Sequence, residues 1–454
     1  MSFQDFPWQY WAQIRGDQPA LTLGHESLNW CELCQRVDAL AGGFRQQGVL
    51  EGQGVALRAK NSPEMVFALL ALLQCGARVL PLNPQLPAPV LEHLLPTLTI
   101  SHALTFDAPL TVADINPLTL LESEPFKVEW QPARFASMTL TSGSTGLPKA
   151  AVHTSDAHLA SAAGVLAVMN YGANDSWLLS LPLFHVSGQG ILWRWLLVGG
   201  CMVVRDLYPL SDALQGCTHA SLVPTQLWRM LEQSPPESLR EVLLGGAAIP
   251  VELTQAAQEK GINCWCGYGL TELASTVCAK RADGLPDVGE ALPGREVKIV
   301  DQEVWIRADS LASGYWKEGV VVPLVNSQGW FATRDRGVLN AHRLTLIGRL
   351  DNLFFSGGEG IQPEEVERVI AVHPAVKQVF VVPIDDPEFG QRPVAVVEAD
   401  EDFDLSLLSE WLPGKVARFQ HPVRWLRLPD EFKQGGIKIS RVQLKLWVKR
   451  EATI

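Results

Sequence analysis

Apolar residues in the first 200 positions alternate between short continuous runs and longer segments of helical spacing. The apolar run 66–73 follows Asn-Ser-Pro-Glu at 61–64, which supplies a capping side chain, a proline for the first helical turn and an early acid. The run is far shorter than the roughly 20 residues that span a bilayer, so it predicts a buried helix. Other apolar runs predict strands, at 54–57, 78–82, 138–141 and 177–181.

Strands and helices alternate to about residue 340, which predicts an α/β domain of parallel sheets covered by helices. Edge or hairpin strands are predicted at 303–307 and 343–348, and the glycine-rich turn at 356–360 marks a domain boundary. Beyond this turn, a helix at 363–370 and strands at 378–382 and 394–397 predict a second, α+β unit. We therefore expect an N-terminal domain of residues 1–350 and a C-terminal domain of residues 351–454.

Composition narrows the class of protein. A chain of 454 residues with 47% apolar and 19% charged positions exceeds one hydrophobic core. Its formal charge of −12 opposes binding to nucleic acid or anionic membranes, so small molecules are the expected partners. The N-terminus lacks a basic and apolar leader, which predicts a cytoplasmic protein without membrane insertion. The sequence leaves open whether the chain forms a homo-oligomer. The eight scattered cysteines, Cys31 and Cys34 included, predict core residues rather than a zinc site, because no second pair or histidine follows at zinc spacing.

The segment 138–149, Met-Thr-Leu-Thr-Ser-Gly-Ser-Thr-Gly-Leu-Pro-Lys, leads from a strand into a loop of hydroxyls and glycines closed by a lysine. Glycines let backbone N–H groups approach an anion, and hydroxyls and a lysine add donors and charge. A solvated Ser/Gly linker is the alternative, but linkers are not normally bounded by a buried strand and a helix. The segment is not a Walker loop, because the residue order Gly-x-x-x-x-Gly-Lys-Ser/Thr is absent from it. The candidate phosphate-binding residues are Thr141, Ser142, Gly143, Ser144, Thr145, Gly146 and Lys149.

This loop resembles the phosphate-loop signature of the adenylate-forming superfamily, which includes acyl-CoA synthetases, luciferases and peptide-synthetase adenylation domains. Further segments resemble its other signatures in the same order, namely 268–272 (Tyr-Gly-Leu-Thr-Glu), 333–337 (Thr-Arg-Asp-Arg-Gly), 348–351 (Gly-Arg-Leu-Asp), 357–361 (Gly-Gly-Glu-Gly-Ile) and 438–441 (Lys-Ile-Ser-Arg). The resemblance implies a large AMP-binding domain, a small mobile C-terminal domain, and activation of a carboxylate by ATP before transfer to a thiol such as CoA.

The resemblance also implies roles for single residues. Glu272 would hold Mg²⁺, a cation that prefers carboxylate and phosphate oxygens, and Thr271 would donate to the α-phosphate. Asp335 would accept from both ribose hydroxyls, and Arg349 would make a second nucleotide contact. The adenine would lie against residues that offer an aromatic face or backbone groups, namely Tyr268, Gly245, Gly246, Ala247, Gly267 and Gly269. One departure is Arg334, where the superfamily usually carries glycine.

In the C-terminal domain, Lys438 matches the lysine that bridges the acyl carboxylate and ATP during adenylation. The superfamily usually has glycine before this lysine, whereas Ile437 precedes it here, so Lys433 is a rival candidate. Asp351 matches the residue about which the small domain rotates. Gly357 and Gly358 would leave room for the pantetheine arm of CoA.

Four residues are candidates for binding the acyl substrate, namely His185, Ser187, Arg194 and Thr276. For Thr276, simple packing in the core is an equal alternative. His185 matches the histidine beside the acyl carboxylate, and Arg194 interrupts an apolar helix. A buried guanidinium needs a protein acid or an anionic substrate, and physics alone leaves the two equal. Longer runs, such as 182–190 and 218–226, resemble the branch of the superfamily that ligates 2-succinylbenzoate to CoA in menaquinone biosynthesis. That dicarboxylate would give Arg194 a partner.

Other functions remain as alternatives. The enzyme could activate another aryl or short-chain acid, or load the phosphopantetheine of a carrier protein, in which case free CoA would not serve as acceptor. A hydrolase is disfavoured because His185 stands where a nucleophile elbow ending in Ser187 needs glycine. A non-catalytic nucleotide-binding protein would be expected to lack Glu272 or Lys438, and both are present.

Overall fold

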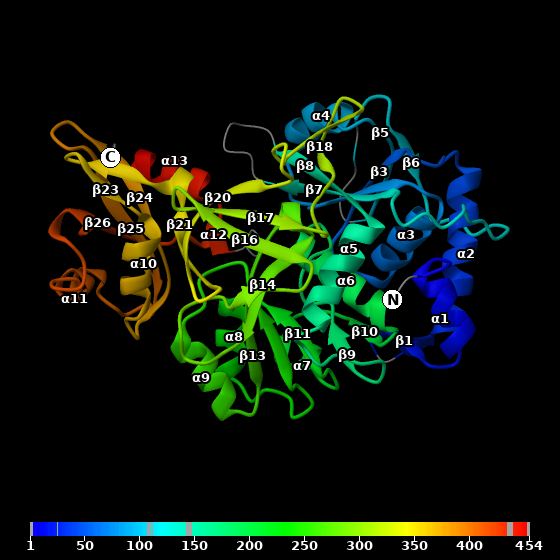
Figure 1. Ribbon diagram of the computed structural model, residues 1–454, viewed down its shortest axis with the longest axis horizontal. Coiled ribbons are helices and arrows are strands. Elements are labelled where there is room, and N and C mark those ends of the chain that lie inside the picture. The colour runs from blue at the N-terminus through cyan, green and yellow to red at the C-terminus, as the bar shows by residue number, and fades with distance from the viewer. Residues whose placement is uncertain are drawn as a thin grey trace.

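The computed structural model describes residues 3–24, 26–106, 110, 112–141, 148–433 and 439–451. They form a large N-terminal α/β domain and a small C-terminal domain, which lies at the left of Figure 1. The last strand of the large domain ends at Arg349, and the next strand begins at Phe354. The expected boundary between residues 350 and 351 falls in this junction and stays a prediction.

One sheet of the large domain has nine strands. Its central strands are parallel, and antiparallel strands close both edges. In spatial order they are β15 (Glu290–Ala291), β14 (Ser275–Arg281), β13 (Asn263–Leu270), β12 (Glu241–Leu244), β11 (His219–Leu222), β9 (Ser176–Leu178), β10 (Cys201–Val204), β1 (Pro19–Leu23) and β2 (Glu26–Asn29).

The second large sheet has eight strands, of which β3 to β7 run parallel and the remaining three antiparallel. In spatial order they are β19 (Val320–Val322), β18 (Gly314–Lys317), β8 (Lys149–Thr154), β7 (Phe135–Thr141), β4 (Arg78–Leu82), β3 (Gly54–Arg58), β5 (Ile100–Thr105) and β6 (Asn116–Leu118). The pairing of β18 with β8 brings residues more than 150 positions apart together.

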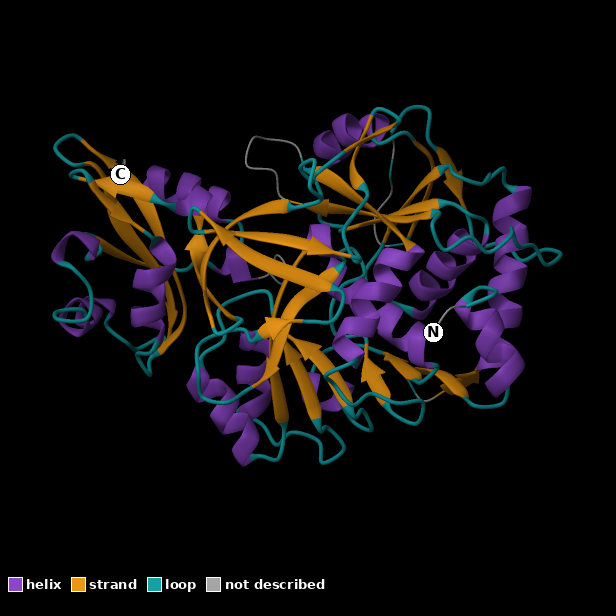
Figure 2. Cartoon of the chain, in the orientation of Figure 1, coloured by secondary structure: helices purple, strands orange, loops and turns teal. Residues whose placement is uncertain are grey.

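Helices cover both sheets, and α5 and α6 lie between them (Figures 1 and 2). The helices of this domain are α1 (Pro7–Arg15), α2 (Trp30–Gln46), α3 (Pro63–Gln74), α4 (Ala88–Thr97), α5 (Ser155–Leu166), α6 (Val186–Val198), α7 (Leu210–Ala213), α8 (Pro224–Leu231) and α9 (Val251–Glu259). A continuous core joins α6 to both sheets and includes the fully buried Trp177 and Trp195. Such a core fixes the position of α6 relative to the strand ends.

A four-stranded antiparallel sheet connects the two domains. Its strands are β16 (Arg295–Val300), β17 (Glu303–Ala308), β20 (Phe331–Asn340) and β21 (Arg343–Arg349). After the 3₁₀ turn η2 (Leu350–Asn352), the small domain comprises β22 (Phe354–Ser356), β23 (Glu359–Ile361), α10 (Pro363–Ala371), β24 (Val376–Asp386), β25 (Gly390–Ala399), η3 (Leu405–Leu407), α11 (Leu408–Trp411), η4 (Arg418–Gln420), β26 (Arg424–Arg427), α12 (Asp430–Lys433) and α13 (Arg441–Glu451).

Several predicted elements are confirmed. The helix at 66–73 is α3, whose first turn Ser62 caps by accepting from the Met65 N–H at 3.1 Å. The strand at 78–82 has the predicted bounds, whereas the one predicted at 177–181 ends at residue 178. Six of the eight cysteines are buried, as expected. Among the described helices, none combines the length and apolar character needed to cross a membrane.

Candidate active site

Tyr268, Asp335 and Arg349 meet where the nine-stranded sheet faces the four-stranded sheet. The Tyr268 hydroxyl, from β13, donates to Asp335 Oδ2 at 2.6 Å, and Arg349 Nη1, from β21, lies 2.9 Å from Asp335 Oδ1. The Asp335 N–H donates to Thr333 Oγ1 at 3.0 Å. Asp335 is only 7% exposed. The residue expected to bind ribose is therefore held in position by hydrogen bonds to both of its carboxylate oxygens.

Charges at this cluster are coupled. Burial and the neighbouring Asp335 carboxylate raise the pKa of Tyr268, which keeps the phenol a donor. Burial alone would lower the pKa of Arg349, but Asp335 and Asp351 outweigh it and raise that pKa. The cation therefore persists at all working pH values.

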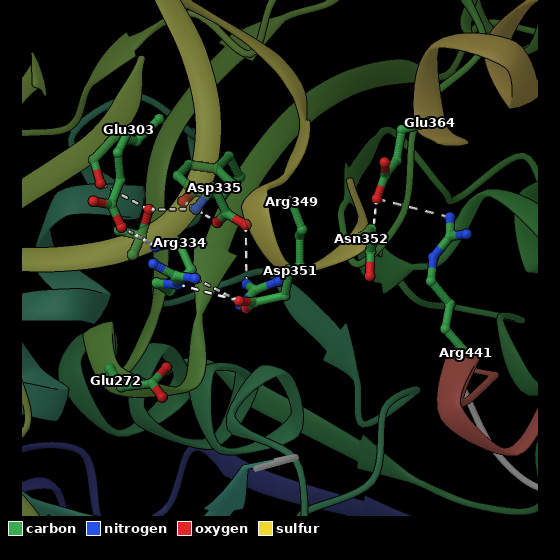
Figure 3. A network of polar contacts seen from close by, with 12 residues as sticks. Glu272, Glu303, Arg334, Asp335, Arg349, Asp351, Asn352, Glu364 and Arg441 are labelled. Carbon is green, nitrogen blue, oxygen red and sulfur yellow. Dashed lines mark hydrogen bonds and ion pairs between the residues drawn. The ribbon is translucent and has the colours of Figure 1, made fainter. Parts of the chain in front are cut away.

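Arg334 departs from the superfamily pattern, and its backbone shows why glycine is usual there. Its φ is +65°, a left-handed conformation that glycine adopts at little cost. Two contacts hold it: its N–H donates to Glu303 Oε1 at 2.8 Å, and its guanidinium pairs with Asp351. Figure 3 shows Arg334 and Arg349 converging on Asp351. This arginine therefore adds a link between the sheet and the residue expected to act as the hinge.

The network continues into the small domain. Asn352 donates to Glu364 Oε1, and Arg441 lies 3.8 Å from the same oxygen (Figure 3). Arg441 is itself fixed, because Nη2 lies 2.5 Å from Glu367 Oε2 and Nη1 donates to Val381 O at 3.0 Å. The start of α13, three residues after the candidate lysine in the sequence, is thus anchored on the small domain's own sheet.

Glu272 lies at the other side of the site, on the 3₁₀ turn η1 (Thr271–Leu273) that follows β13. It is 8% exposed, and the Tyr315 hydroxyl donates to its Oε1 at 2.7 Å. Lys149 Nζ lies 5.1 Å from the centre of the same tyrosine ring. Tyr315 therefore lies between Lys149 and the candidate metal ligand Glu272. A single carboxylate suits Mg²⁺, which takes most of its ligands from substrate phosphates and water.

The strand ends beside Glu272 carry the glycines expected near the base. Gly269 pairs with Thr276 across β13 and β14. A Cβ at Gly269 would lie 2.1 Å from Ser275 O, so only glycine fits. Gly267 lies beside Thr276, and Gly245 beside Gly267 O. Gly245, Gly246 and Ala247 thus follow the end of β12, and Gly267 lies within β13, one residue past its last pairing with β12.

His185 occupies the N-cap position of α6, and Ser187 lies in the first turn of that helix. The segment before it is held by Asn61, which donates to Leu179 O and Leu181 O and accepts from the Leu183 N–H at 2.9 Å. Asn61 thereby fixes the approach to His185, a role that sequence reasoning missed although the residue preceded a recognised helix start.

Arg194 is 2% exposed, and among the described residues no carboxylate lies within 4.0 Å of it. Its Nη2 donates to Ser221 Oγ at 3.3 Å, and its Nε lacks a partner in the described part of the chain. Burial lowers the pKa of Arg194 to about 9, which leaves it charged at neutral pH. A Cβ at Gly190 would lie 3.4 Å from Nη1, so the glycine leaves room beside the cation. The described residues therefore offer Arg194 no acidic side chain, and an anionic substrate remains as its possible partner.

The other candidate residues lie away from this cluster or outside the described residues. Gly357 and Gly358, at the β22–β23 turn, have φ of +58° and +87°, and the Gly357 N–H donates to Phe389 O within the small domain. Lys433 pairs with Asp430 at 2.7 Å. Thr141 ends β7, opposite Lys149. Six candidates fall outside the described residues, namely Ser142, Gly143, Ser144, Thr145, Gly146 and Lys438.

Comparison with known proteins gives the class. Residues 8–316 match the model of the AMP-binding enzyme family, and residues 365–432 match that of the AMP-binding enzyme C-terminal domain. The chain belongs to the AMP-binding enzymes.

Particular members are similar over their whole length. The 2-succinylbenzoate–CoA ligase of Escherichia coli (strain K12) is 65% identical over 453 residues, which cover 99% of this chain and 100% of the relative. That of Haemophilus influenzae is 45% identical over 463 residues, with 99% and 100% covered.

Solved structures of 2-succinylbenzoate–CoA ligases are also similar to this chain over nearly its whole length. An arginine-to-lysine variant of E. coli MenE with bound OSB-AMS has a TM-score of 0.96 and 64% identity, covering 99% of this chain and 100% of that one. Bacillus subtilis MenE in complex with ATP and magnesium ion has a TM-score of 0.84 and 26% identity, with 94% and 96% covered.

Proposed function

We propose that this chain ligates 2-succinylbenzoate to CoA in menaquinone biosynthesis, with ATP as the energy source and AMP and pyrophosphate as products. The relatives that cover the whole chain carry this activity in their names. The enzyme draws ATP, CoA and Mg²⁺ from the cytoplasm, where we place it.

The observation that carries the choice of substrate is the buried Arg194. Its guanidinium has no carboxylate partner among the described residues, and an unpaired buried cation is costly. A monocarboxylic acid would offer only the carboxyl that is activated. A dicarboxylate such as 2-succinylbenzoate brings a second, unreactive carboxylate that supplies the missing partner.

In the first half-reaction, an oxygen of the succinyl carboxylate attacks the α-phosphorus of ATP, and the bond to pyrophosphate breaks. Thr271 donates to the α-phosphate, and Lys438 and Lys149 counter the negative charge on the reacting oxygens. Mg²⁺, held by Glu272, would neutralise phosphate charge when bound. Asp335, fixed by Tyr268 and Arg349, holds the ribose.

In the second half-reaction, the CoA thiol gives up its proton to solvent and its thiolate sulfur attacks the acyl carbon, the bond to the phosphate oxygen breaks, and AMP leaves. His185 lies beside that carbonyl. The adenylation lysine must withdraw to admit the thiol, so the small domain turns about Asp351 and brings Gly357 and Gly358 to the pantetheine arm.

The test is formation of the CoA thioester from ATP, Mg²⁺ and CoA with 2-succinylbenzoate, run beside benzoate and a medium-chain fatty acid. We expect 2-succinylbenzoyl-CoA and AMP from the first acid alone. If the enzyme were active only with a different acid, the assignment of 2-succinylbenzoate as its substrate would be wrong. Adenylation of 2-succinylbenzoate without transfer to CoA would indicate that a carrier protein is the acceptor.

A further inference from the structure

The guanidinium of Arg194 lies over the face of a tryptophan. Its Cζ is 4.6 Å from the centre of the Trp177 ring, and Trp177 is fully buried in β9 at the centre of the nine-stranded sheet. A cation over an aromatic face is stabilised by the ring's negative quadrupole, most strongly where water is excluded. This contact therefore stabilises the buried cation although no described carboxylate lies within 4.0 Å of it.

The Trp177 ring is itself held in position. The Tyr171 ring meets it edge-on, with centroids 5.0 Å apart, and the His219 ring lies 5.2 Å away. His219 is in turn fixed by Thr218 Oγ1 at 2.8 Å and Asn170 O at 3.1 Å. Trp177 Nε1 has no hydrogen-bond partner among the described residues, so its N–H does not explain why a tryptophan stands here.

We propose that Trp177 is a positioning residue for substrate recognition: its ring stabilises and orients the Arg194 guanidinium without neutralising it. An Asp or Glu at this position would occupy the N–H donors and compete with the substrate. A ring contacts the π face of the guanidinium and leaves its in-plane N–H groups available for a carboxylate. This inference rests on the proposed function and adds the element that keeps its second-carboxylate site charged.

The test compares Trp177→Leu and Trp177→Phe with a matched control, Trp195→Leu. Trp195 is equally buried and follows Arg194 in α6, but it stacks on Trp30 at 5.1 Å. Each purified variant is assayed for its KM for 2-succinylbenzoate and for ATP, and its thermal midpoint is measured to separate recognition from folding.

We expect Trp177→Leu to raise the KM for 2-succinylbenzoate about 10-fold or more, with the KM for ATP changed less than about twofold. Trp177→Phe, which keeps a weaker aromatic face, should give an intermediate KM. Trp195→Leu should lower the thermal midpoint without this selective rise. Equal KM changes in Trp177→Leu and Trp195→Leu would overturn the proposal.

A second substrate separates this inference from the proposed function. 4-Oxo-4-phenylbutanoate retains the succinyl chain and lacks the ring carboxylate. With it, kcat/KM should be nearly the same for wild type and Trp177→Leu, and an equal loss with both acids would contradict the positioning role. If wild type forms no thioester from 2-succinylbenzoate, the proposed function fails first, and the inference fails with it.

Discussion

Arg334 and Asp351 form an ion pair across the junction between the two domains. Arg334 Nη2 and Nε lie 2.8 and 3.2 Å from Asp351 Oδ1, while Arg349 Nη2 lies 3.1 Å from Oδ2. Burial alone would raise the pKa of Asp351, but the two arginines outweigh it and lower that pKa. One carboxylate is thus shared by two strands of the connecting sheet, which restrains the turn that leads into the small domain.

Replacing Arg334 by glycine should loosen this junction without unfolding the protein. The variant loses a largely exposed ion pair, worth about 0.2–1 kcal/mol, and relieves a left-handed backbone conformation that costs a residue with a side chain about 1 kcal/mol. We expect a thermal midpoint within about 2 °C of wild type. Limited proteolysis, with sites mapped by mass spectrometry, should show faster cleavage at residues 350–353.

Arg307→Ala is the control, because Arg307 makes an exposed pair with Glu296 in the same sheet, away from the junction. It should leave cleavage at residues 350–353 unchanged. Identical cleavage in wild type and Arg334→Gly would show that the ion pair does not restrain the junction.

Tyr315 should tune the metal dependence of adenylation. Its hydroxyl donates to Glu272, and groups that orient a metal ligand typically change metal affinity or activity about 10- to 100-fold when removed. We expect Glu272→Gln to raise the Mg²⁺ concentration for half-maximal activity at least about 10-fold, and Tyr315→Phe to raise it by a smaller factor. Pyrophosphate release titrated against Mg²⁺ measures both.

The matched carboxylate is Glu303, which accepts from the Arg334 N–H instead. Glu303→Gln should keep the wild-type Mg²⁺ titration. If Tyr315→Phe also has the wild-type Mg²⁺ titration, the Tyr315 hydroxyl does not influence metal binding, and the residue contributes only to packing.

Arg194→Ala should impair the use of 2-succinylbenzoate far more than ATP binding. Truncating one partner of a buried charge pair costs about 2–5 kcal/mol, which corresponds to a loss of roughly 30-fold or more in kcat/KM. Arg194→Lys keeps the charge but loses the planar donor pair, so it should retain more activity than the alanine variant. Steady-state kinetics with each substrate varied in turn give the comparison. An unchanged kcat/KM in Arg194→Ala would sink the assigned role.

Acid should weaken a cluster that ties β14 to β21. Lys280 and Arg343 both contact Asp283, at 2.5 Å each. Burial alone would raise the pKa of Asp283, but these hydrogen bonds outweigh it and lower that pKa to about 2. A lowered folded-state pKa means that the stabilisation is complete above about pH 4 and is lost as the pH falls toward 2.

The variant that reports this effect is Asp283→Asn. Its thermal midpoint should lie about 1–3 °C below wild type at pH 7, and the gap should close as the pH falls from 4 toward 2. Asp430→Asn, in a more exposed pair with Lys433, is the control. A gap that is constant with pH would exclude titration of Asp283 as the cause.

Local sequence was sufficient for elements whose apolar pattern and caps agree. The bounds of β4 and the start of α3 follow from such signals. Residues that act through contacts distant in sequence were not predictable in this way. Tyr315 reaches Glu272 only because β18 pairs with β8, and Ser221 meets Arg194 only because β11 lies beside β9. The signature residues Asp335 and Arg349 were identified by resemblance, but their mutual contact needed the sheet register.

The order in which the chain is synthesised sets when nucleotide can help it fold. A nascent chain that has reached Arg281 already contains Tyr268 and Glu272, yet the strands that carry Asp335 and Arg349 are still missing. A ligand stabilises only states that bind it. ATP in the cell should therefore favour the native fold only after the ribosome has released the chain through Arg349, and earlier intermediates must rely on their own cores.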